Sequence, residues 1–191
     1  MTFNELDKRA IEWNQIANGH RTPENRYDVQ IDMCNEEMLK EYFYWYGEFI
    51  KYERNHDERK ILIEMLDGIA DSFFVFAELR NILKLADSQG KYISHFYFML
   101  DLALDTAKPI FREDTITKAY HRVIESNFSK FILDCEAFDK HAAINEQLRM
   151  VEKYGEPIEK ELNNGYWVFR DSNGKIRKPS TFKPVDLSDL I

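Results

Sequence analysis

Residues 61–76 decide the fold, and they read Ile61-Leu-Ile-Glu64-Met-Leu-Asp67-Gly-Ile-Ala-Asp71-Ser-Phe73-Phe-Val-Phe76. An α-helix turns about 100° per residue, so Glu64, Asp67 and Asp71 fall within an arc of about 60°. The opposite side of the helical wheel is apolar and carries Leu62, Leu66, Ile69 and Phe73. This spacing predicts an amphipathic helix over residues 60–86 that buries one face and presents a stripe of acids on the other.

The acid stripe has two interpretations. It is either a solvated helix face or a place where a cation binds, and a solvated face usually mixes charges of both signs. No Lys or Arg occurs from Ile61 to Leu79, and Asp67 and Asp71 stand four residues apart, a spacing at which like charges repel. A bound cation would remove that repulsion. Gly68 lies directly beside the acid arc and leaves room there for another group to approach.

Residues 32–54 are predicted to form an aromatic-rich helix with a second acid stripe. Glu37, Glu41 and Glu48 fall within about 40° of one another on its wheel. If the polar residues 53–59 turn the chain back, the two helices run antiparallel and their acid stripes can face each other. Carboxylates from facing helices suit Mg²⁺ or Mn²⁺. The pattern therefore predicts a helical protein with a carboxylate metal site.

Most of the remaining chain is also predicted to be helical. We expect further helices at residues 3–17, 92–107, 114–127 and 138–154, and a loop at residues 21–25. Near the C-terminus, Asn173-Gly174 separates the short runs 165–170 and 175–178, which predicts a β-hairpin with a type I′ turn. The expected fold is an all-α helical bundle over residues 1–164, with the hairpin and extended tail of residues 165–191 packed on the same domain.

The composition excludes several functional classes. The chain has 191 residues, with 26 Lys and Arg against 34 Asp and Glu, and a net charge of −8. It contains no apolar run long enough for a membrane span and no signal-peptide pattern, so we expect a cytoplasmic protein. Its two cysteines cannot form a disulfide framework. The acidic charge disfavours nucleic acid, and a polyanionic substrate would need a divalent cation between itself and the protein.

Three segments of the chain together form a recognisable pattern. Residues 64–71 fit E-x-x-D-G-x-A-D before an apolar run, and residues 123–130 fit V-x-x-S-N-x-S-K. Residues 173–187 contain G-K-x-x-K-P followed by P-x-D-L. In this order, the three segments resemble the all-α nucleoside triphosphate pyrophosphohydrolases, and among them the phage-type subgroup of the MazG-like and phosphoribosyl-ATP pyrophosphohydrolase group.

The resemblance implies an enzyme that uses Mg²⁺, or Mn²⁺, to cleave a nucleotide into a monophosphate and pyrophosphate, with water attacking the α-phosphorus. It implies that Glu41 and Glu64 are catalytic. The implied metal ligands are Glu37, Glu41, Glu64, Asp67 and Asp71. The implied substrate-binding residues are Asn127, Lys130, Lys175 and Lys178. The family also implies a homodimer or homotetramer, with neither nucleic acid nor membrane as a partner.

The chain departs from the family pattern at two places. The family's first motif is E-E-x-x-E, whereas residues 36–41 read Glu-Glu-Met-Leu-Lys-Glu, with the last Glu one position late. Whether Glu37 or Glu48 accompanies Glu41 as a ligand is therefore open. Residues 77–114 look like an inserted or elongated helical hairpin. Two alternatives follow: an inactive relative that binds a nucleotide or a protein, and a purely structural helical protein with solvated acid stripes.

Overall fold

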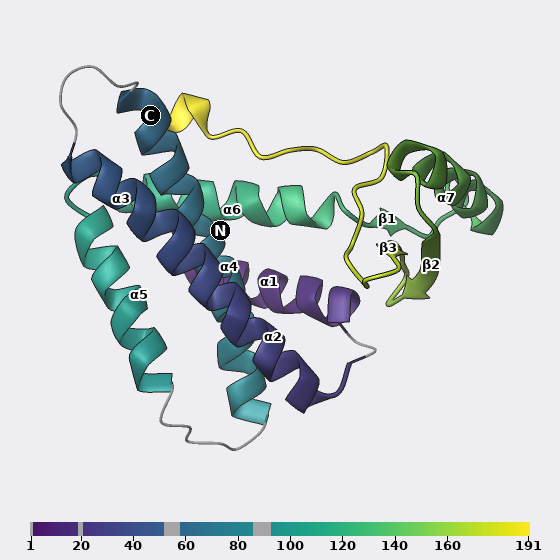
Figure 1. Ribbon diagram of the computed structural model, residues 1–191, viewed down its shortest axis with the longest axis horizontal. Coiled ribbons are helices and arrows are strands. Elements are labelled where there is room, and N and C mark those ends of the chain that lie inside the picture. The colour runs from purple at the N-terminus through teal and green to yellow at the C-terminus, as the bar shows by residue number, and fades with distance from the viewer. Residues whose placement is uncertain (1, 19–20, 52–57, 86–92) are drawn as a thin grey trace. The chain divides into compact units, whose positions relative to one another are not determined.

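The computed structural model describes residues 2–18, 21–51, 58–85 and 93–191. The chain is mostly helical and carries a small three-stranded antiparallel sheet (Figure 1). It divides into two compact units by the contacts within the chain. Unit 1 comprises residues 1–11, 21–124 and 186–191, and unit 2 comprises residues 12–20 and 125–185. Among the described residues, no helix combines the length and apolar character that crossing a bilayer would require.

Among the described residues, seven helical elements precede the sheet. They are α1 (Phe3–Asn18), α2 (Pro23–Asn35), the π-helix η1 (Glu36–Tyr42), α3 (Phe43–Ile50), α4 (Glu58–Leu85), α5 (Ile93–Ala107) and α6 (Glu113–Phe128). The boundary between the two units falls inside α1 and inside α6. The structure confirms the expected helices over residues 3–17, 60–85, 93–107 and 114–127, while residues 86 and 92, at the ends of two of these predictions, lie outside the described residues. Of the expected polar connection, residues 53–57 lie outside the described residues, and the last two residues already belong to α4.

The second helical stretch begins earlier than expected. Residues 21–25 were predicted to be a loop, and this prediction was wrong, because α2 starts at Pro23. Thr22 is its N-cap, and its side chain accepts a hydrogen bond from the backbone N–H of Asn25 (3.4 Å). Proline suits the first turn of a helix because its missing N–H would have no partner there. From this start, α2, η1 and α3 follow one another as a single rod (Figure 1).

The apolar face of α4 forms the centre of unit 1. Three of the four side chains on the apolar side of the wheel, Leu66, Ile69 and Phe73, are almost fully buried, whereas the fourth, Leu62, is half-buried. Met65, next to them on the wheel, is also buried. The helix packs against α2, η1, α3 and α5. Two charged residues of α4 are neutralised within the unit, because Glu78 pairs with Arg26 and Arg80 pairs with Asp7. The amphipathic pattern of residues 61–76 is thus confirmed in its buried half.

Unit 2 contains the sheet and one further helix. The strands are β1 (Ile132–Leu133), β2 (Ile158–Asn163) and β3 (Tyr166–Asp171), in the order β1-β3-β2, and α7 (Lys140–Tyr154) packs on them. Asp139 caps the start of α7, and Gly155, with φ of 69°, ends it in the left-handed conformation. The core of this unit consists of Ile132, Ala143, Met150, Ile158, Trp167 and Phe169.

Two turns shape the sheet, and only one of them was expected. Asn164 and Gly165 both have positive φ (48° and 79°) and connect β2 to β3 in a two-residue hairpin, as type I′ turns require. The turn at residues 173–174 is present, with the Gly174 N–H donating to the Asp171 carbonyl (2.9 Å). It is not type I′, because among the described non-glycine residues only Asn164 has positive φ. The chain after it forms a single bridge to β3 and then continues as an extended tail to the short 3₁₀ helix η2 (Ser188–Leu190) of unit 1.

Candidate functional site

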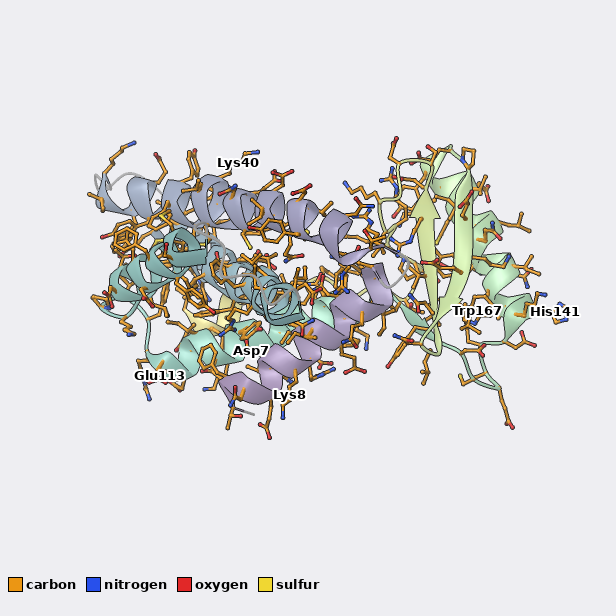
Figure 2. The ribbon with its side chains drawn as sticks, turned by 90° about the horizontal axis from the view of Figure 1, so that it is seen from below. Asp7, Lys8, Lys40, Glu113, His141 and Trp167 are labelled. Carbon is orange, nitrogen blue, oxygen red and sulfur yellow. The ribbon has the colours of Figure 1, made fainter. Side chains whose placement is uncertain are left out.

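A π-helix carries the first acid stripe. In η1 the hydrogen bonds span five residues, as in the bond from the Phe43 N–H to the Met38 carbonyl. Such segments are rare and frequently occur at functional sites. Glu36 and Lys40 form an exposed ion pair (3.4 Å), and Lys40 projects from the outer side of η1 (Figure 2). Of the two adjacent glutamates, Glu37 is the one whose carboxylate is grouped with those of Glu41 and Asp71.

The backbone of η1 touches α4 at Gly68. A Cβ atom built at this glycine would lie 2.9 Å from the backbone nitrogen of Tyr42 and 3.0 Å from its Cα. Real side chains essentially never approach backbone so closely, so only glycine fits here. Tyr42 is itself buried, and its hydroxyl donates to the Ala103 carbonyl of α5 (3.0 Å). The space that the sequence predicted beside Gly68 is thus filled by η1, and this contact brings the two acid stripes together.

The carboxylates of η1 and α4 form a cluster. Glu37, Glu41 and Asp71 each contribute one carboxylate oxygen to a group whose atoms lie within 4.8 Å of one another. Asp67 stands on the same face of α4, and its Oδ1 is buried without a hydrogen-bond partner among the described residues. A buried carboxylate oxygen without a partner is costly, because folding removes its hydration and returns nothing. A cation beside the cluster would satisfy it.

The electrostatics of the cluster reflect crowding of like charges. Burial, followed by the negative charges of Glu41 and Glu64, raises the pKa of Asp67 to about 6. Burial and the charges of Glu64 and Glu36 also raise the pKa of Glu41. The negative charge of Glu64 therefore contributes to the raised pKa of both Asp67 and Glu41. Without a cation, mutual repulsion and partial burial both disfavour the charged form of these carboxylates.

The donor set fits a hard divalent cation. Carboxylate oxygens are the ligands that Mg²⁺ and Mn²⁺ prefer. Cys34, near the end of α2 that leads into η1, does not add a soft ligand. Burial and the charge of Glu37 raise the pKa of its thiol and keep it protonated. The fit therefore rests on oxygen ligands alone.

The structure bears on the choice between Glu37 and Glu48. It places Glu37 beside Glu41 and Asp71, whereas Glu48 of α3 lies 3.6 Å from the ammonium of Lys51. Tyr44, also on α3, is 55% exposed and packs edge-on against Trp45. The geometry thus favours Glu37 as the companion of Glu41.

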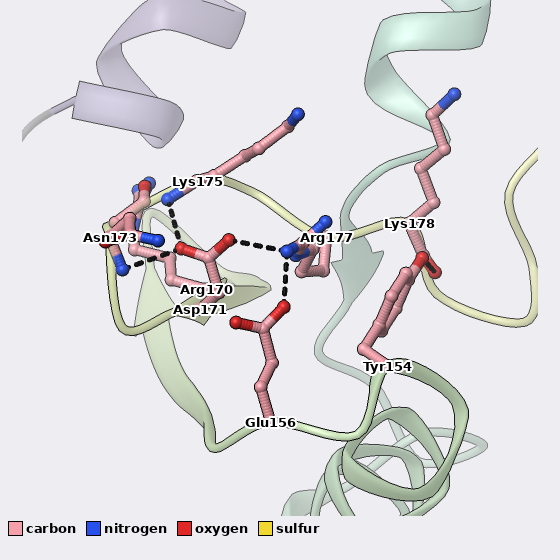
Figure 3. A network of polar contacts seen from close by, with 9 residues as sticks. Tyr154, Glu156, Arg170, Asp171, Asn173, Lys175, Arg177 and Lys178 are labelled. Atoms are coloured by element: carbon pink, nitrogen blue, oxygen red, sulfur yellow. Dashed lines mark hydrogen bonds and ion pairs between the residues drawn. The ribbon is translucent and has the colours of Figure 1, made fainter.

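The four predicted substrate-binding residues all belong to unit 2. Asn127 is 9% exposed at the end of α6, and its Oδ1 accepts a hydrogen bond from the Lys130 ammonium (2.5 Å). The same ammonium lies 5.7 Å from the centre of the Trp13 ring, whose Nε1 donates to the Asn127 carbonyl (2.8 Å). Asn127 and Lys130 therefore contact each other. Lys175 and Lys178 lie on the tail that follows β3 (Figure 3).

Sequence reasoning did not identify three residues that shape these regions. Tyr42 sets the contact between η1 and α4, and Asp171 and Glu146 are buried carboxylates that bind the tail. The Asp171-Ser-Asn-Gly sequence carries a signal for the first of these carboxylates, because an Asp that opens a turn often accepts from backbone N–H groups ahead of it. The other two have no local signal, since their partners are distant in the sequence.

The chain was compared with protein-family models, with curated proteins and with solved structures. None of the three comparisons found a match.

Proposed function

We propose that this protein is a metal-dependent nucleotide pyrophosphohydrolase of the MazG-like, phage-type kind, which cleaves a nucleoside triphosphate or a related nucleotide to a monophosphate and pyrophosphate. The observation that carries the proposal is the carboxylate cluster between η1 and α4. Its members come from the two segments that resemble the family's acidic motifs, and it includes a buried oxygen of Asp67 with no hydrogen-bond partner among the described residues.

The π-helix supports the assignment of the first motif. A π turn accommodates one residue more than an α turn, and residues 36–41 carry one residue more than E-E-x-x-E. The late position of Glu41 is thereby absorbed within η1, and Glu41 still lies on the same side as Glu37. The departure in sequence therefore does not exclude the resemblance.

Each carboxylate has a proposed role. Glu37, Glu41, Glu64, Asp67 and Asp71 would hold Mg²⁺ or Mn²⁺, which supplies charge neutralisation and activation of water when bound. Glu41, whose pKa is raised, and Glu64 are proposed to accept the proton of the attacking water. Lys130, Lys175 and Lys178 would neutralise phosphate oxygens as point charges, and Asn127 would bind base or ribose.

We also propose that the protein is cytoplasmic and self-associates as a homodimer or homotetramer. Helix α3 is strongly apolar, yet none of its residues is buried. The large apolar side chains exposed on unit 1 include Leu39, Tyr44, Ile50, Tyr97, Phe98 and Leu102. Exposed apolar surface of this extent is typical of an interaction site.

A panel of nucleotides tests the function. Pyrophosphate release from each nucleoside triphosphate and from phosphoribosyl-ATP is measured with Mg²⁺, with Mn²⁺ and with a chelator. We expect release from at least one nucleotide that depends on the metal. Thermal stabilisation by nucleotide without release would instead support the inactive relative, and neither effect would support a structural protein.

A further inference from the structure

A cavity of about 830 Å³ lies among four helices of unit 1. Its lining residues come from the first residues of the chain and α1, from α4, from α5 and from α6, and they include Asp7 and Glu113 (Figure 2). From α4 come Phe73 and Arg80, which stand about 180° and about 160° from Glu64 on the helical wheel. The cavity therefore lies on the side of α4 opposite the acid stripe, and it is separate from the carboxylate cluster.

A polar network forms one wall of this cavity. The Arg80 guanidinium donates a hydrogen bond to Oδ2 of Asp7 (2.6 Å), and the Tyr120 hydroxyl donates to Oδ1 of the same carboxylate (3.0 Å). Tyr120 is fully buried, whereas Asp7 and Arg80 are half-buried. Each oxygen of Asp7 thus has a partner, and the charge of Arg80 is neutralised within the network.

Two further acids of the cavity are not neutralised in this way. Asp101 of α5 and Glu113 of α6 are exposed, and neither forms an ion pair with a cation of the described residues. Lys108, which lines an adjoining hollow together with Glu113, lies 3.9 Å from Asp105 instead. The described lining of the cavity contains three acids and one arginine, so its net charge is −2.

The remaining walls are apolar and partly aromatic. Phe3 of α1 and Phe73 of α4 pack edge to face, with their ring centres 5.1 Å apart. From α5 come Tyr97, Leu100 and Leu104, which share one helix face because they are spaced three and then four residues apart. A cavity of this size that combines apolar walls with a few polar groups is typical of a small-molecule site.

We propose that this cavity binds a small organic cation, in which an ammonium group is attached to an apolar body. An anion is disfavoured, because among the described lining residues Arg80 is the only cation and it is already paired with Asp7. An ammonium group near Asp101 and Glu113 would meet opposite charge, and its apolar body would cover the aromatic and aliphatic walls. The proposal is independent of the proposed function, because the acids of this cavity are not those of the carboxylate cluster.

Three probes that share one aromatic ring test the proposal. The full chain is titrated with phenethylammonium, with neutral 2-phenylethanol and with anionic phenylacetate, and binding is followed by the NMR shifts of backbone amides. We expect phenethylammonium to shift amides at the cavity wall, among them those of Asp101 and Thr117, with a millimolar Kd, as befits a ligand of about nine non-hydrogen atoms. The alcohol should bind about tenfold more weakly, since each exposed charge pair contributes up to about fivefold, and phenylacetate should bind more weakly still.

Charge variants locate the source of this selectivity. The Asp101→Asn/Glu113→Gln double variant should bind phenethylammonium about tenfold more weakly, because both opposite charges are removed. Its affinity for 2-phenylethanol should equal that of the wild type, which checks that the cavity has kept its shape. Asp114→Asn is the matched control, because Asp114 is also exposed in the first turn of α6 but pairs with Arg112 and Lys118. It should leave both affinities unchanged.

The proposal would be overturned by any of three results. They are the absence of saturable shifts with phenethylammonium up to about 20 mM, an affinity for 2-phenylethanol or phenylacetate equal to that for phenethylammonium, and wild-type affinity for phenethylammonium in the double variant. If the double variant does not fold, Asp101→Asn alone is titrated, because this side chain is exposed and forms no ion pair among the described residues. It should weaken phenethylammonium binding by up to about fivefold and leave 2-phenylethanol binding unchanged, and wild-type affinity for both probes would overturn the proposal.

Discussion

Replacement of Gly68 by alanine should destabilise the protein, although alanine is the better helix former. The added Cβ would lie 2.9 Å from the Tyr42 nitrogen, 3.0 Å from its Cα and 3.3 Å from its Cβ. Two of these atoms belong to the backbone of η1, so a rotamer change cannot relieve the clash. Overpacking of this kind costs about 3 kcal/mol, and the gain in helix propensity is about 1 kcal/mol. We therefore expect a net loss of about 2 kcal/mol in the free energy of unfolding.

Gly47 of α3 provides the matched control. It also lies in a helix, but a Cβ at this position would have no atom within 4 Å. Gly47→Ala should therefore show only the gain in helix propensity, about 0.5–1 kcal/mol. Denaturant unfolding, followed by circular dichroism, measures both variants against the wild type.

The same pair of variants reports on the cluster. Gly68→Ala should push η1, and with it Glu41, away from Asp67 and Asp71, so its affinity for Mn²⁺ should fall, whereas Gly47→Ala should bind Mn²⁺ as the wild type does. If Gly68→Ala is as stable as Gly47→Ala, the two helices do not make the close contact described here, and the reasoning is refuted.

The crowded charge of Asp67 should make the metal-free protein less stable as pH rises from about 4 to about 6, because its pKa is raised from 3.8 to about 6 on folding. The loss is up to about 3 kcal/mol, and denaturant unfolding should show that Asp67→Asn or saturating Mg²⁺ largely removes it. Thr22→Ala should lower the free energy of unfolding by about 0.5–1 kcal/mol through loss of the α2 cap, and an unchanged value would contradict that role. The Phe98→Glu/Leu102→Glu variant should sediment as a smaller species than the wild type at micromolar concentration, and a wild type that is already a monomer would contradict self-association.

The long helices were predictable because their signals are local. The buried half of α4 followed directly from the spacing of Leu66, Ile69 and Phe73. The helix expected over residues 138–154 ends at Tyr154, as α7 does, and Gly155 follows it in the left-handed conformation. The start of α2 was missed although its signal was present, because Thr22-Pro23 was interpreted as part of a loop rather than as a cap followed by a first-turn proline.

The sheet was only partly predictable. The Asn173-Gly174 turn was expected, while the hairpin at Asn164-Gly165 carries the same dipeptide and was overlooked. The strand β2 is mostly polar and shows little alternation of apolar and polar residues, so it gave no clear strand signal. It depends instead on its pairing with β3. The tail after β3 is held at Ser180 by Glu146. Glu146 is distant from that tail in the sequence, so no local signal predicts this contact.

The acids of the candidate site were identified from the sequence, but their arrangement was not. Helical wheels placed Glu37, Glu41 and Glu48 on one stripe and could not choose among them. The choice depends on η1, whose π geometry has no reliable local signature, and on the contact between Gly68 and Tyr42. The choice among these glutamates therefore depends on tertiary packing, which the periodicity of a single helix does not predict.

The account depends most on the cluster being the centre of a metal-dependent hydrolysis. The most direct measurement is the rate of Mg²⁺-dependent pyrophosphate release by Asp71→Asn and by Glu48→Gln, each against the wild type and with the best nucleotide of the panel. Asp71 lies within the cluster, whereas Glu48 lies beside Lys51. The account predicts a fall of about 100-fold or more for Asp71→Asn and a change within about twofold for Glu48→Gln. Wild-type rates in Asp71→Asn would contradict it.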